Sequence, residues 1–408
     1  MTKTKTATFQ AIAGGITAPQ GFRAAGVACG IKANGKRDLS LLVSDRVASA
    51  AGVFTTNLAK AAPVILSAEH LETSGGRSRA IVINSGCANA CTGEDGRLHA
   101  KAMADRTGEA IGCDPSAVLV ASTGVIGVKL DMSIVQRGVA DAAARLSATG
   151  GSDAALAIMT TDPFPKESAI EASAHGRTFR IGGMAKGSGM IEPLMATMLG
   201  VVTTDAGVPP ALLKRALKAA VDDTFNAITV DGECSTNDCV FALANGASGV
   251  ELGDGDFDLL VESLRAACEP LAIGIVRGGE GATKLVTVHV SGAGSNEDAR
   301  KAARAIANSP LVKTAVHGGD PNWGRLIAVA GRAGVPFSLD GAAVRIGPVT
   351  LFSKGTPHDE RAAEAAEYLQ GTEIDVEVDL GTGGRGASRM WTCDLSAEYV
   401  RINAEYRT

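Results

Sequence analysis

The chain has 408 residues, a net charge of −5 at pH 7 and no long run of one charge sign. Proteins that bind nucleic acids or anionic membrane surfaces usually carry a basic patch, so this charge pattern argues against both kinds of partner. No apolar run reaches the ~18 residues that a membrane-spanning helix needs, and residues 1–19 lack the apolar core of a secretory signal. We therefore expect a cytoplasmic protein with no nucleic-acid or membrane contact.

Short apolar runs alternate with helical patterns along the whole chain, which predicts α/β layers around a sheet rather than a pure bundle or sandwich. Strands are predicted at residues 80–84, 117–121, 285–290 and 374–380. Helices are predicted at residues 133–146, 211–221, 257–268, 297–307 and 360–369. Glycine-rich loops are predicted at residues 150–152, 253–255 and 292–295. Aromatic residues make up only 4% of the chain, so the core is expected to consist of Ala, Val, Leu and Ile.

The cysteines and histidines do not form the patterns of a disulfide scaffold or a metal site. The eight cysteines contain no C-x-x-C pair and the six histidines show no H-x-x-x-H spacing, so we expect buried, reduced thiols and no metal. Cys87 lies in a loop that superficially resembles a nucleophile loop, but no base can be assigned to it. His317 precedes Gly-Gly-Asp and is expected to have a structural role or to support a site, and not to bind a metal. Lys186 lacks any accompanying pyridoxal-phosphate motif, and no cofactor is expected.

The most informative segment is residues 182–200, with the sequence GGMAKGSGMIEPLMATMLG. Its small residues around one lysine predict a glycine-rich loop that leads into a buried segment. The segment lacks the G-x-x-x-x-G-K-[ST] order of a phosphate-binding loop. On its residues alone, Thr197 reads as an ordinary strand or helix threonine, and Lys186 as a solvated loop lysine.

This segment resembles the signature of the ornithine acetyltransferase family, also called the ArgJ or bifunctional glutamate N-acetyltransferase family. Further blocks that resemble the family are ASTGVIG at 121–127, MTTD at 159–162, DGECSTND at 231–238, HGGDPNWGR at 317–325 and the chain end YVRINAEYRT at 399–408. The resemblance therefore extends over essentially the whole chain and preserves the order of the blocks.

The resemblance implies that the precursor cleaves its own backbone between Ala196 and Thr197. The products would be an α chain of residues 1–196 and a β chain of residues 197–408, parts of one interwoven fold with a further, smaller domain. The fold implied is the layered α/β body of self-cleaving N-terminal-nucleophile enzymes, and the assembly implied is an α2β2 heterotetramer. A freed α-amine has a pKa of about 7.7 to 8 and can take the proton of the Thr197 hydroxyl.

The resemblance also assigns the remaining site residues. The hydroxyl of Thr123 and the backbone N–H of Gly124 would stabilise the oxyanion, and substrate contacts would come from Thr160, Lys186, Thr197, Glu280, Asn403 and Thr408. The implied reaction moves an acetyl group from N-acetyl-L-ornithine to L-glutamate through acetyl-Thr197. We expect Lys186 to meet the substrate carboxylate and Glu280 its side-chain ammonium. Some members also use acetyl-CoA, and no residue decides this point.

Two other functions fit the same residues less well. The same self-cleaving architecture serves amidases and aminopeptidases, in which water takes the acyl group from the nucleophile. A non-catalytic homologue is expected to have lost the nucleophile or the oxyanion loop, yet Thr197, Thr123 and Gly124 are all present. Acetyl transfer is therefore the preferred prediction, with the hydrolase as the alternative.

Overall fold

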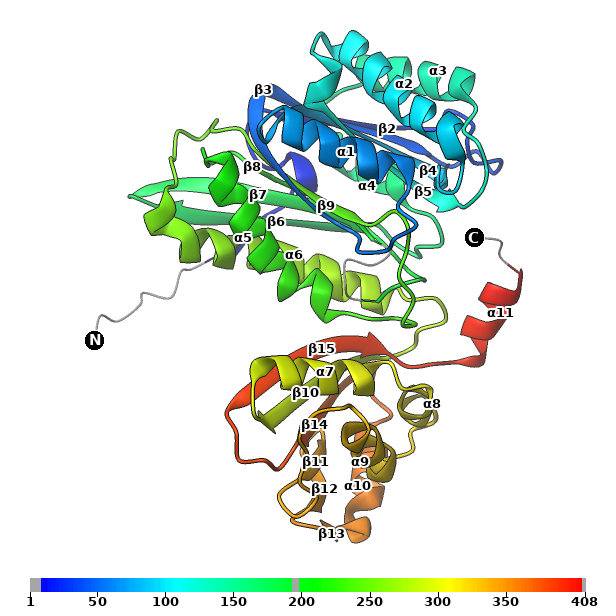
Figure 1. Ribbon diagram of the computed structural model, residues 1–408, viewed down its shortest axis with the longest axis vertical. Coiled ribbons are helices and arrows are strands. Elements are labelled where there is room, and N and C mark those ends of the chain that lie inside the picture. The colour runs from blue at the N-terminus through cyan, green and yellow to red at the C-terminus, as the bar shows by residue number, and fades with distance from the viewer. Residues whose placement is uncertain (1–8, 193–197, 406–408) are drawn as a thin grey trace. The chain divides into compact units, whose positions relative to one another are not determined.

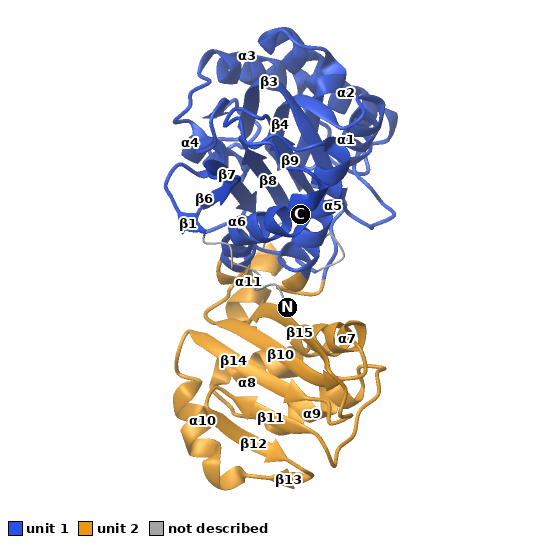
Figure 2. Cartoon of the chain, turned by 90° about the vertical axis from the view of Figure 1, so that its left-hand side faces the viewer, with its two compact units in different colours: residues 1–226, 233–275, 408 blue, residues 227–232, 276–407 orange. Residues whose placement is uncertain are grey.

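The computed structural model describes residues 9–192 and 198–405, and the chain forms two compact units (Figure 2). Unit 1 contains the described residues up to Asn226 together with Glu233–Ile275, and unit 2 contains Ala227–Gly232 and the described residues from Val276 onward. Residues 198–226 therefore belong to the same unit as residues 9–192. The predicted α and β chains, residues 1–196 and 197–408, therefore do not coincide with the two units.

Unit 1 is built on a nine-stranded mixed sheet, in the order β1-β6-β7-β8-β9-β3-β4-β5 with β2 paired to β3 (Figure 1). Its strands are β1 (Gln10–Ala11), β2 (Phe22–Val27), β3 (Leu39–Phe54), β4 (Arg77–Cys87), β5 (Val118–Val125), β6 (Lys166–Ala174), β7 (Arg177–Lys186), β8 (Leu199–Thr204) and β9 (Cys239–Ala244). The long strand β3 pairs with β4 through its first half and with β9 through Ser49–Phe54, and its register shifts between Val43 and Ala48. This irregular strand joins the half of the sheet that contains β4 and β5 to the half that contains β9, β8, β7, β6 and β1.

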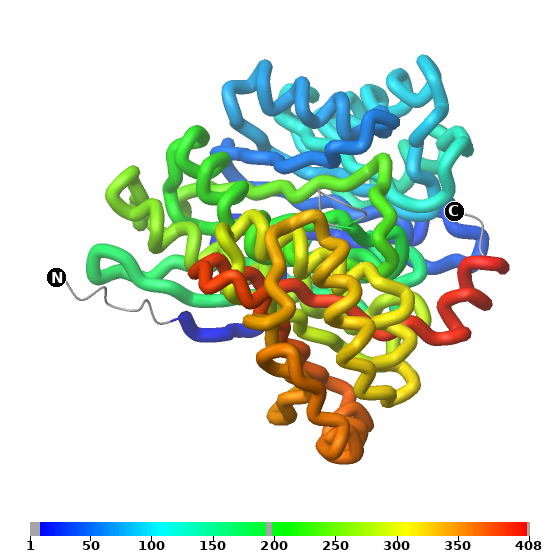
Figure 3. The backbone as a smooth tube through the Cα atoms, turned by 60° about the horizontal axis from the view of Figure 1, so that its bottom comes forward, coloured from blue at the N-terminus to red at the C-terminus, as the bar shows by residue number. Residues whose placement is uncertain are grey.

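Helices cover both halves of this sheet. They are α1 (Ala62–Thr73), α2 (Gly93–Ile111), α3 (Met132–Ala144), α4 (Gly151–Ile158), α5 (Pro210–Asp222) and α6 (Phe257–Arg277). Helices α1–α3 group on the outer side of β4 and β5 (Figures 1 and 3). One core lies between α2, α3 and strands β2–β5, and a second joins α4 to strands from both halves. Both cores consist mainly of Ala, Val, Leu and Ile, as predicted.

Unit 2 is a six-stranded sheet in the order β13-β12-β11-β14-β10-β15. Its strands are β10 (Leu285–Ala293), β11 (Ala343–Ile346), β12 (Val349–Ser353), β13 (Thr356–Pro357), β14 (Glu373–Asp379) and β15 (Gly386–Cys393). Its helices are α7 (Asn296–Ala307), α8 (Pro310–Gly318), α9 (Trp323–Gly331), α10 (Ala362–Tyr368) and α11 (Ala397–Glu405). Side chains of α7, α8, α9 and α10 pack on the sheet in one core. In β10 the valines 286, 288 and 290 point into this core while Thr287 and His289 do not, which confirms the predicted alternation.

Three local predictions differ in part from the structure. Residues 150–152 are not a loop, because α4 begins at Gly151. Helix α6 continues to Arg277, beyond the predicted end at residue 268, although Pro270 lies inside it. Residues 253–255 overlap a short 3-10 turn, Asp254–Asp256. Within the described ranges, no helix has the length and apolar character needed to cross a membrane.

Candidate functional site

The predicted oxyanion residues lie near the end of β5, where β5 pairs in parallel with β4. Thr123 is opposite Ser85 and Gly124 is opposite Gly86, and a β-bulge follows at Cys87. Gly124 has φ of 127°, and a Cβ atom placed on it would be 2.4 Å from the carbonyl carbon of Gly86. Only glycine fits here, because both the dihedral angle and the close backbone approach exclude a side chain.

Replacing Gly124 by alanine is therefore expected to displace its N–H from the oxyanion position. Loss of one such donor lowers kcat by about 10²- to 10³-fold in comparable enzymes, and steady-state kinetics of the predicted acetyl transfer would measure it. Gly127 offers a matched control, because it also has a positive φ (80°) but no heavy atom lies within 4 Å of the place that a Cβ would take. Gly127→Ala should keep kcat within a few-fold of the parent. A folded Gly124→Ala protein with parental kcat would contradict the assignment.

The strand end that carries Thr123 is fixed from a distant part of the chain. The side-chain amide of Asn237 donates hydrogen bonds to the carbonyl oxygens of Ala88 (2.6 Å) and Ser122 (2.8 Å). The Ser122 hydroxyl in turn donates to Asn84 Oδ1 at 2.5 Å. Buried polar groups paired in this way resist displacement. Asn237 lies in the family block at 231–238, but nothing in the local sequence pattern indicates this role.

Lys186 does not lie in a solvated loop. It is the last residue of β7, its exposed fraction is 3%, and its Nζ donates to Thr123 Oγ1 at 3.3 Å. Because this bond uses an acceptor lone pair of the hydroxyl, the Thr123 proton is free to be donated to a developing oxyanion. The structure therefore brings Thr123 and Lys186 together.

The glycines before Lys186 are not a flexible loop either, which corrects the prediction for the start of residues 182–200. Gly182 and Gly183 lie inside β7. A Cβ on Gly182 would be 2.1 Å from the carbonyl oxygen of Gly15, and one on Gly183 would be 2.8 Å from Leu271 Cδ1. These glycines therefore provide space for neighbouring segments to pack on the strand.

Asp162 connects the Thr160 segment to the Lys186 segment. Its Oδ2 accepts the backbone N–H of Thr160 at 3.0 Å, and its Oδ1 accepts the backbone N–H of Gly187 at 2.7 Å and Lys166 Nζ at 2.5 Å. Burial alone would raise the pKa of this carboxyl, but Lys186, Lys166 and the hydrogen bonds outweigh burial and lower the pKa to about 2. A permanent carboxylate thus holds Thr160 beside the end of β7.

Lys32 reaches the same segment from the loop between β2 and β3. Its Nζ donates to the carbonyl oxygens of Met159 (2.7 Å) and Arg37 (2.8 Å). Burial lowers the pKa of Lys32 to about 8. Lys32, Thr160 and Asp162 line part of a cavity of about 610 Å³ in unit 1, a size within the usual range of ligand pockets.

A second buried acid, Asp238, directly precedes β9 and lies beside the start of β8. Asp238 Oδ1 accepts the backbone N–H of Met198 at 2.9 Å, and its Oδ2 has no hydrogen-bond partner among the described residues. Burial raises the pKa of Asp238 well above its ordinary value. Met198 directly follows Thr197 in the sequence. Ala196 and Thr197 themselves lie outside the described residues.

In unit 2, the structure brings together two of the predicted substrate contacts. The side-chain amide of Asn403, on α11, donates to Glu280 Oε2 at 2.9 Å. Gly281 has φ of 68°, and a Cβ on it would be 2.4 Å from the backbone nitrogen of Tyr399. Glycine at 281 therefore allows α11 to approach the Glu280 loop closely. Thr408, the last predicted contact, lies outside the described residues.

Comparison with known proteins shows a match over nearly the whole chain. The ArgJ family model matches residues 23–408. The chain belongs to the ArgJ family. It is 50% identical to the "Arginine biosynthesis bifunctional protein ArgJ" of Symbiobacterium thermophilum, over 97% of this chain and 99% of that protein. It is 48% identical to the protein of the same name from Parasynechococcus marenigrum, over 98% of this chain and 97% of that protein. The family named from sequence blocks is thereby confirmed.

Two solved structures of ArgJ-related proteins are also similar. The Bacillus halodurans ArgJ chain is 41% identical and has a TM-score of 0.49; the match covers 50% of this chain and 98% of that one. Mycobacterium tuberculosis ornithine acetyltransferase, solved in complex with ornithine, is 42% identical and has a TM-score of 0.42; the match covers 46% of this chain and 98% of that one.

The remaining cysteine and histidine predictions have mixed outcomes. All eight cysteines are free, but Cys91 is exposed, which corrects the expectation of uniformly buried thiols. Burial raises the pKa of Cys87, whose Sγ donates to the carbonyl oxygen of Val128 at 3.1 Å. Such a thiol is a poor nucleophile. Across residues 9–192 and 198–405, no group of three His, Cys, Asp or Glu side chains could hold a metal ion.

Proposed function

We propose that this protein transfers an acetyl group from N-acetyl-L-ornithine to L-glutamate through an acetyl ester on Thr197. The observation that carries the proposal is the arrangement at the end of β5. There the Thr123 hydroxyl accepts a hydrogen bond from Lys186 and lies next to a glycine whose backbone admits no side chain. Such a pair of donors suits the oxyanion of an acyl transfer. The names of the relatives, bifunctional arginine-biosynthesis proteins, support the same activity.

The reaction would begin with self-cleavage. The Thr197 hydroxyl oxygen attacks the carbonyl carbon of Ala196, the C–N bond breaks, and the departing nitrogen takes up a proton. Water then hydrolyses the resulting ester, which leaves a carboxylate on Ala196 and a free α-amine on Thr197. That amine is the general base for the next attack by the same hydroxyl. The products would be chains 1–196 and 197–408, which we propose assemble as an α2β2 heterotetramer in the cytoplasm.

Acetyl transfer would then proceed in two halves at one site. The Thr197 oxygen attacks the acetyl carbon of N-acetyl-L-ornithine, the amide bond breaks, and ornithine leaves with the proton on its amine. The amine of glutamate next attacks the ester and regenerates the hydroxyl. We assign Lys186 to the substrate carboxylate and Glu280 to the ornithine side-chain ammonium, with Thr160, Asn403 and Thr408 as further contacts. No cofactor is required by this chemistry, and acetyl-CoA would enter, if used, only as another acetyl donor.

The test is a transfer assay with N-acetyl-L-ornithine that carries ¹³C in its acetyl group. Mass spectrometry should find the label in N-acetylglutamate, and initial rates at several concentrations of both substrates should give the parallel lines of a ping-pong mechanism. Labelled acetate whose rate of release is independent of glutamate would instead identify the amidase alternative. Absence of both products from a correctly cleaved protein would refute acyl transfer from this donor.

A further inference from the structure

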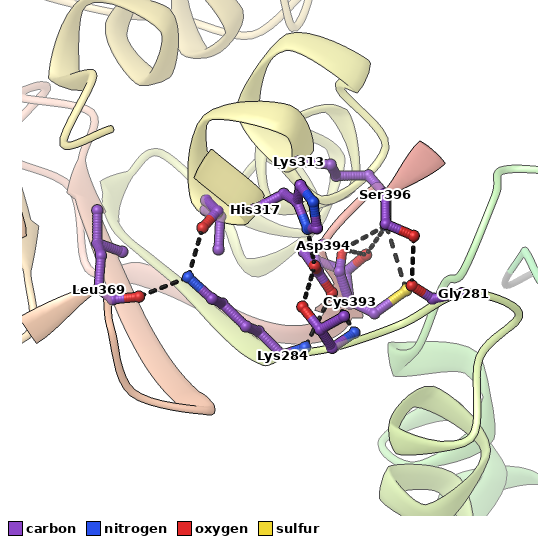
Figure 4. Close-up of polar contacts among 11 residues, drawn as sticks. Gly281, Lys284, Lys313, His317, Leu369, Cys393, Asp394 and Ser396 are labelled. Atoms are coloured by element: carbon purple, nitrogen blue, oxygen red, sulfur yellow. Dashed lines mark hydrogen bonds and ion pairs between the residues drawn. The ribbon is translucent and has the colours of Figure 1, made fainter. Parts of the chain in front are cut away.

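The loop that carries Glu280 is anchored to a single buried carboxylate in unit 2, Asp394 (Figure 4). Asp394 Oδ1 accepts the backbone N–H groups of Thr283 (2.7 Å) and Lys284 (2.8 Å), and its Oδ2 accepts the Thr283 hydroxyl at 2.5 Å. The side chain of Asp394 has an exposed fraction of 0%. Burial raises its pKa, but these bonds outweigh burial and lower the pKa below its ordinary value. Asp394 is therefore a charged acceptor that fixes three donors of one loop.

The partners of Asp394 connect this loop to the helices of unit 2. His317, on α8, contacts Asp394 Oδ2 through Nδ1 at 2.6 Å. Lys284 Nζ donates to the carbonyl oxygens of Val316 (2.9 Å) and Leu369 (2.5 Å), at the ends of α8 and α10 (Figure 4). The position of residues 283 and 284 is thus set by the body of the unit and not by the loop alone. This explains the supporting role predicted for His317.

The other side of the loop is held just as closely. The Ser396 hydroxyl donates to the carbonyl oxygen of Gly281 at 2.6 Å. Gly281 also lies against the backbone of Tyr399 at the start of α11, and α11 supplies Asn403 to the Glu280 carboxylate. Asp394 and Ser396 are two residues apart, so one short segment after β15 fixes the loop on both sides of residue 282. A carboxylate held this way can bind a cation with little ordering cost.

We propose that Asp394, supported by His317, is a positioning residue that places Glu280 and thereby sets the selectivity of the enzyme for an acetyl donor with a positively charged side chain. The proposal rests on the proposed function, in which Glu280 meets the ornithine ammonium. Asp394 itself touches no substrate in this scheme. Its effect on catalysis would pass through the backbone of residues 281–284 to the Glu280 carboxylate.

The test compares two acetyl donors of equal chain length. N-Acetyl-L-norvaline has the carbon skeleton of N-acetyl-L-ornithine but lacks the side-chain amine. A change in kcat/KM for this donor therefore reports every effect of a substitution except its effect on the ammonium contact. Asp394→Asn keeps the shape of the side chain but replaces one acceptor by an N–H₂ donor that faces donors. In Asp394→Asn, the kcat/KM for N-acetyl-L-ornithine divided by the kcat/KM for N-acetyl-L-norvaline should fall by roughly 10-fold or more. This is the size of the effect of losing one charge-assisted hydrogen bond. Self-cleavage, measured by mass, should be unchanged.

Two further variants distinguish positioning from general damage to the fold. Asp379→Asn is the matched control, because Asp379, the last residue of β14, belongs to the same unit and its Oδ1 accepts a single backbone N–H, that of Gly381, at 2.8 Å. This variant should leave the ratio unchanged. Glu280→Gln should lower the ratio, and adding Asp394→Asn to it should lower the ratio no further, because both act on one contact.

Additive losses in the double variant, or an equal fall for both donors in Asp394→Asn, would overturn the positioning role. Failure of the proposed function would give a different result from failure of this inference. If the parent protein does not use N-acetyl-L-ornithine at all, no ratio exists. If the parent does use it and the Asp394→Asn ratio stays at the parental value, acetyl transfer stands and only this inference falls.

Discussion

Replacing Thr197 by alanine is expected to leave the chain in one piece and to abolish acetyl transfer. Alanine lacks the oxygen that attacks the Ala196 carbonyl, so no ester forms and the α-amine that serves as general base is never released. The activity of an enzyme that loses its covalent nucleophile falls by a factor on the order of 10⁶. Denaturing mass spectrometry should show two fragments that meet between residues 196 and 197 in the parent, and a single chain in the variant.

Thr197→Ser is the matched control, because serine keeps the hydroxyl and removes only a methyl group. It should still cleave and still transfer acetyl groups, at reduced rates. The two variants together distinguish the loss of the nucleophile from a disturbed fold. A parent protein that stays whole after prolonged incubation, although folded, would rule out self-activation, and a Thr197→Ala protein that still breaks at this bond would assign the cleavage to another group.

Local sequence patterns predicted the elements that have a regular period and a polar boundary. The strands around residues 80–84 and 117–121 appear as β4 and β5, and the helix at 211–221 appears as α5 with Pro210 at its first position. The patterns failed where packing overrides composition. Gly182 and Gly183 predict a loop, yet both lie in strand β7, where the absence of a side chain leaves room for a neighbouring segment to pack. Only the folded chain defines that contact.

The site could be assigned from family blocks but not from the physical patterns of single segments. Lys186 and Thr123 are 63 residues apart, and Asn237 is 115 residues from Ser122, so no local periodicity relates them. The anchoring roles of Asp162 and Asp394 could not be predicted from the sequence either, because a carboxylate that accepts backbone N–H groups has the same sequence pattern as a surface acid. Their function follows from burial, which depends on tertiary structure. The family blocks at 159–162 and 231–238 nevertheless contain Asp162 and Asn237.

The buried ion pair between Asp162 and Lys166 carries the largest expected effect on stability. The two side chains are 0% and 2% exposed and their charged atoms are 2.5 Å apart. Asp162→Asn would leave Lys166 in a buried position without its counterion, although burial already lowers the pKa of that lysine. Breaking a buried pair by removing one partner costs about 3–5 kcal/mol of unfolding free energy. The midpoint of urea unfolding should fall accordingly.

A matched surface pair gives the control for this prediction. Lys101 and Asp105 have the same i,i+4 spacing and a 2.8 Å contact, but their side chains are 64% and 44% exposed. Asp105→Asn should hardly move the midpoint, because solvent screens an exposed pair. Equal shifts for Asp105→Asn and Asp162→Asn would show that burial does not set the strength of the pair.

The pH dependence of the Asp162→Asn effect has a definite sign. The folded pKa of Asp162 is about 2, below its ordinary value of 3.8, so the unfolded chain binds more protons between these values. The stability that Asp162 provides is therefore fully present above about pH 4 to 5 and is lost as the pH falls towards 2. Unfolding of parent and variant should thus differ most at neutral pH and less at pH 3.

Because the same carboxylate holds Thr160 and Gly187, the variant should also lose acetyl transfer at urea concentrations where it remains folded. A variant that keeps full activity would show that the placement of Thr160 and Lys186 does not depend on this anion.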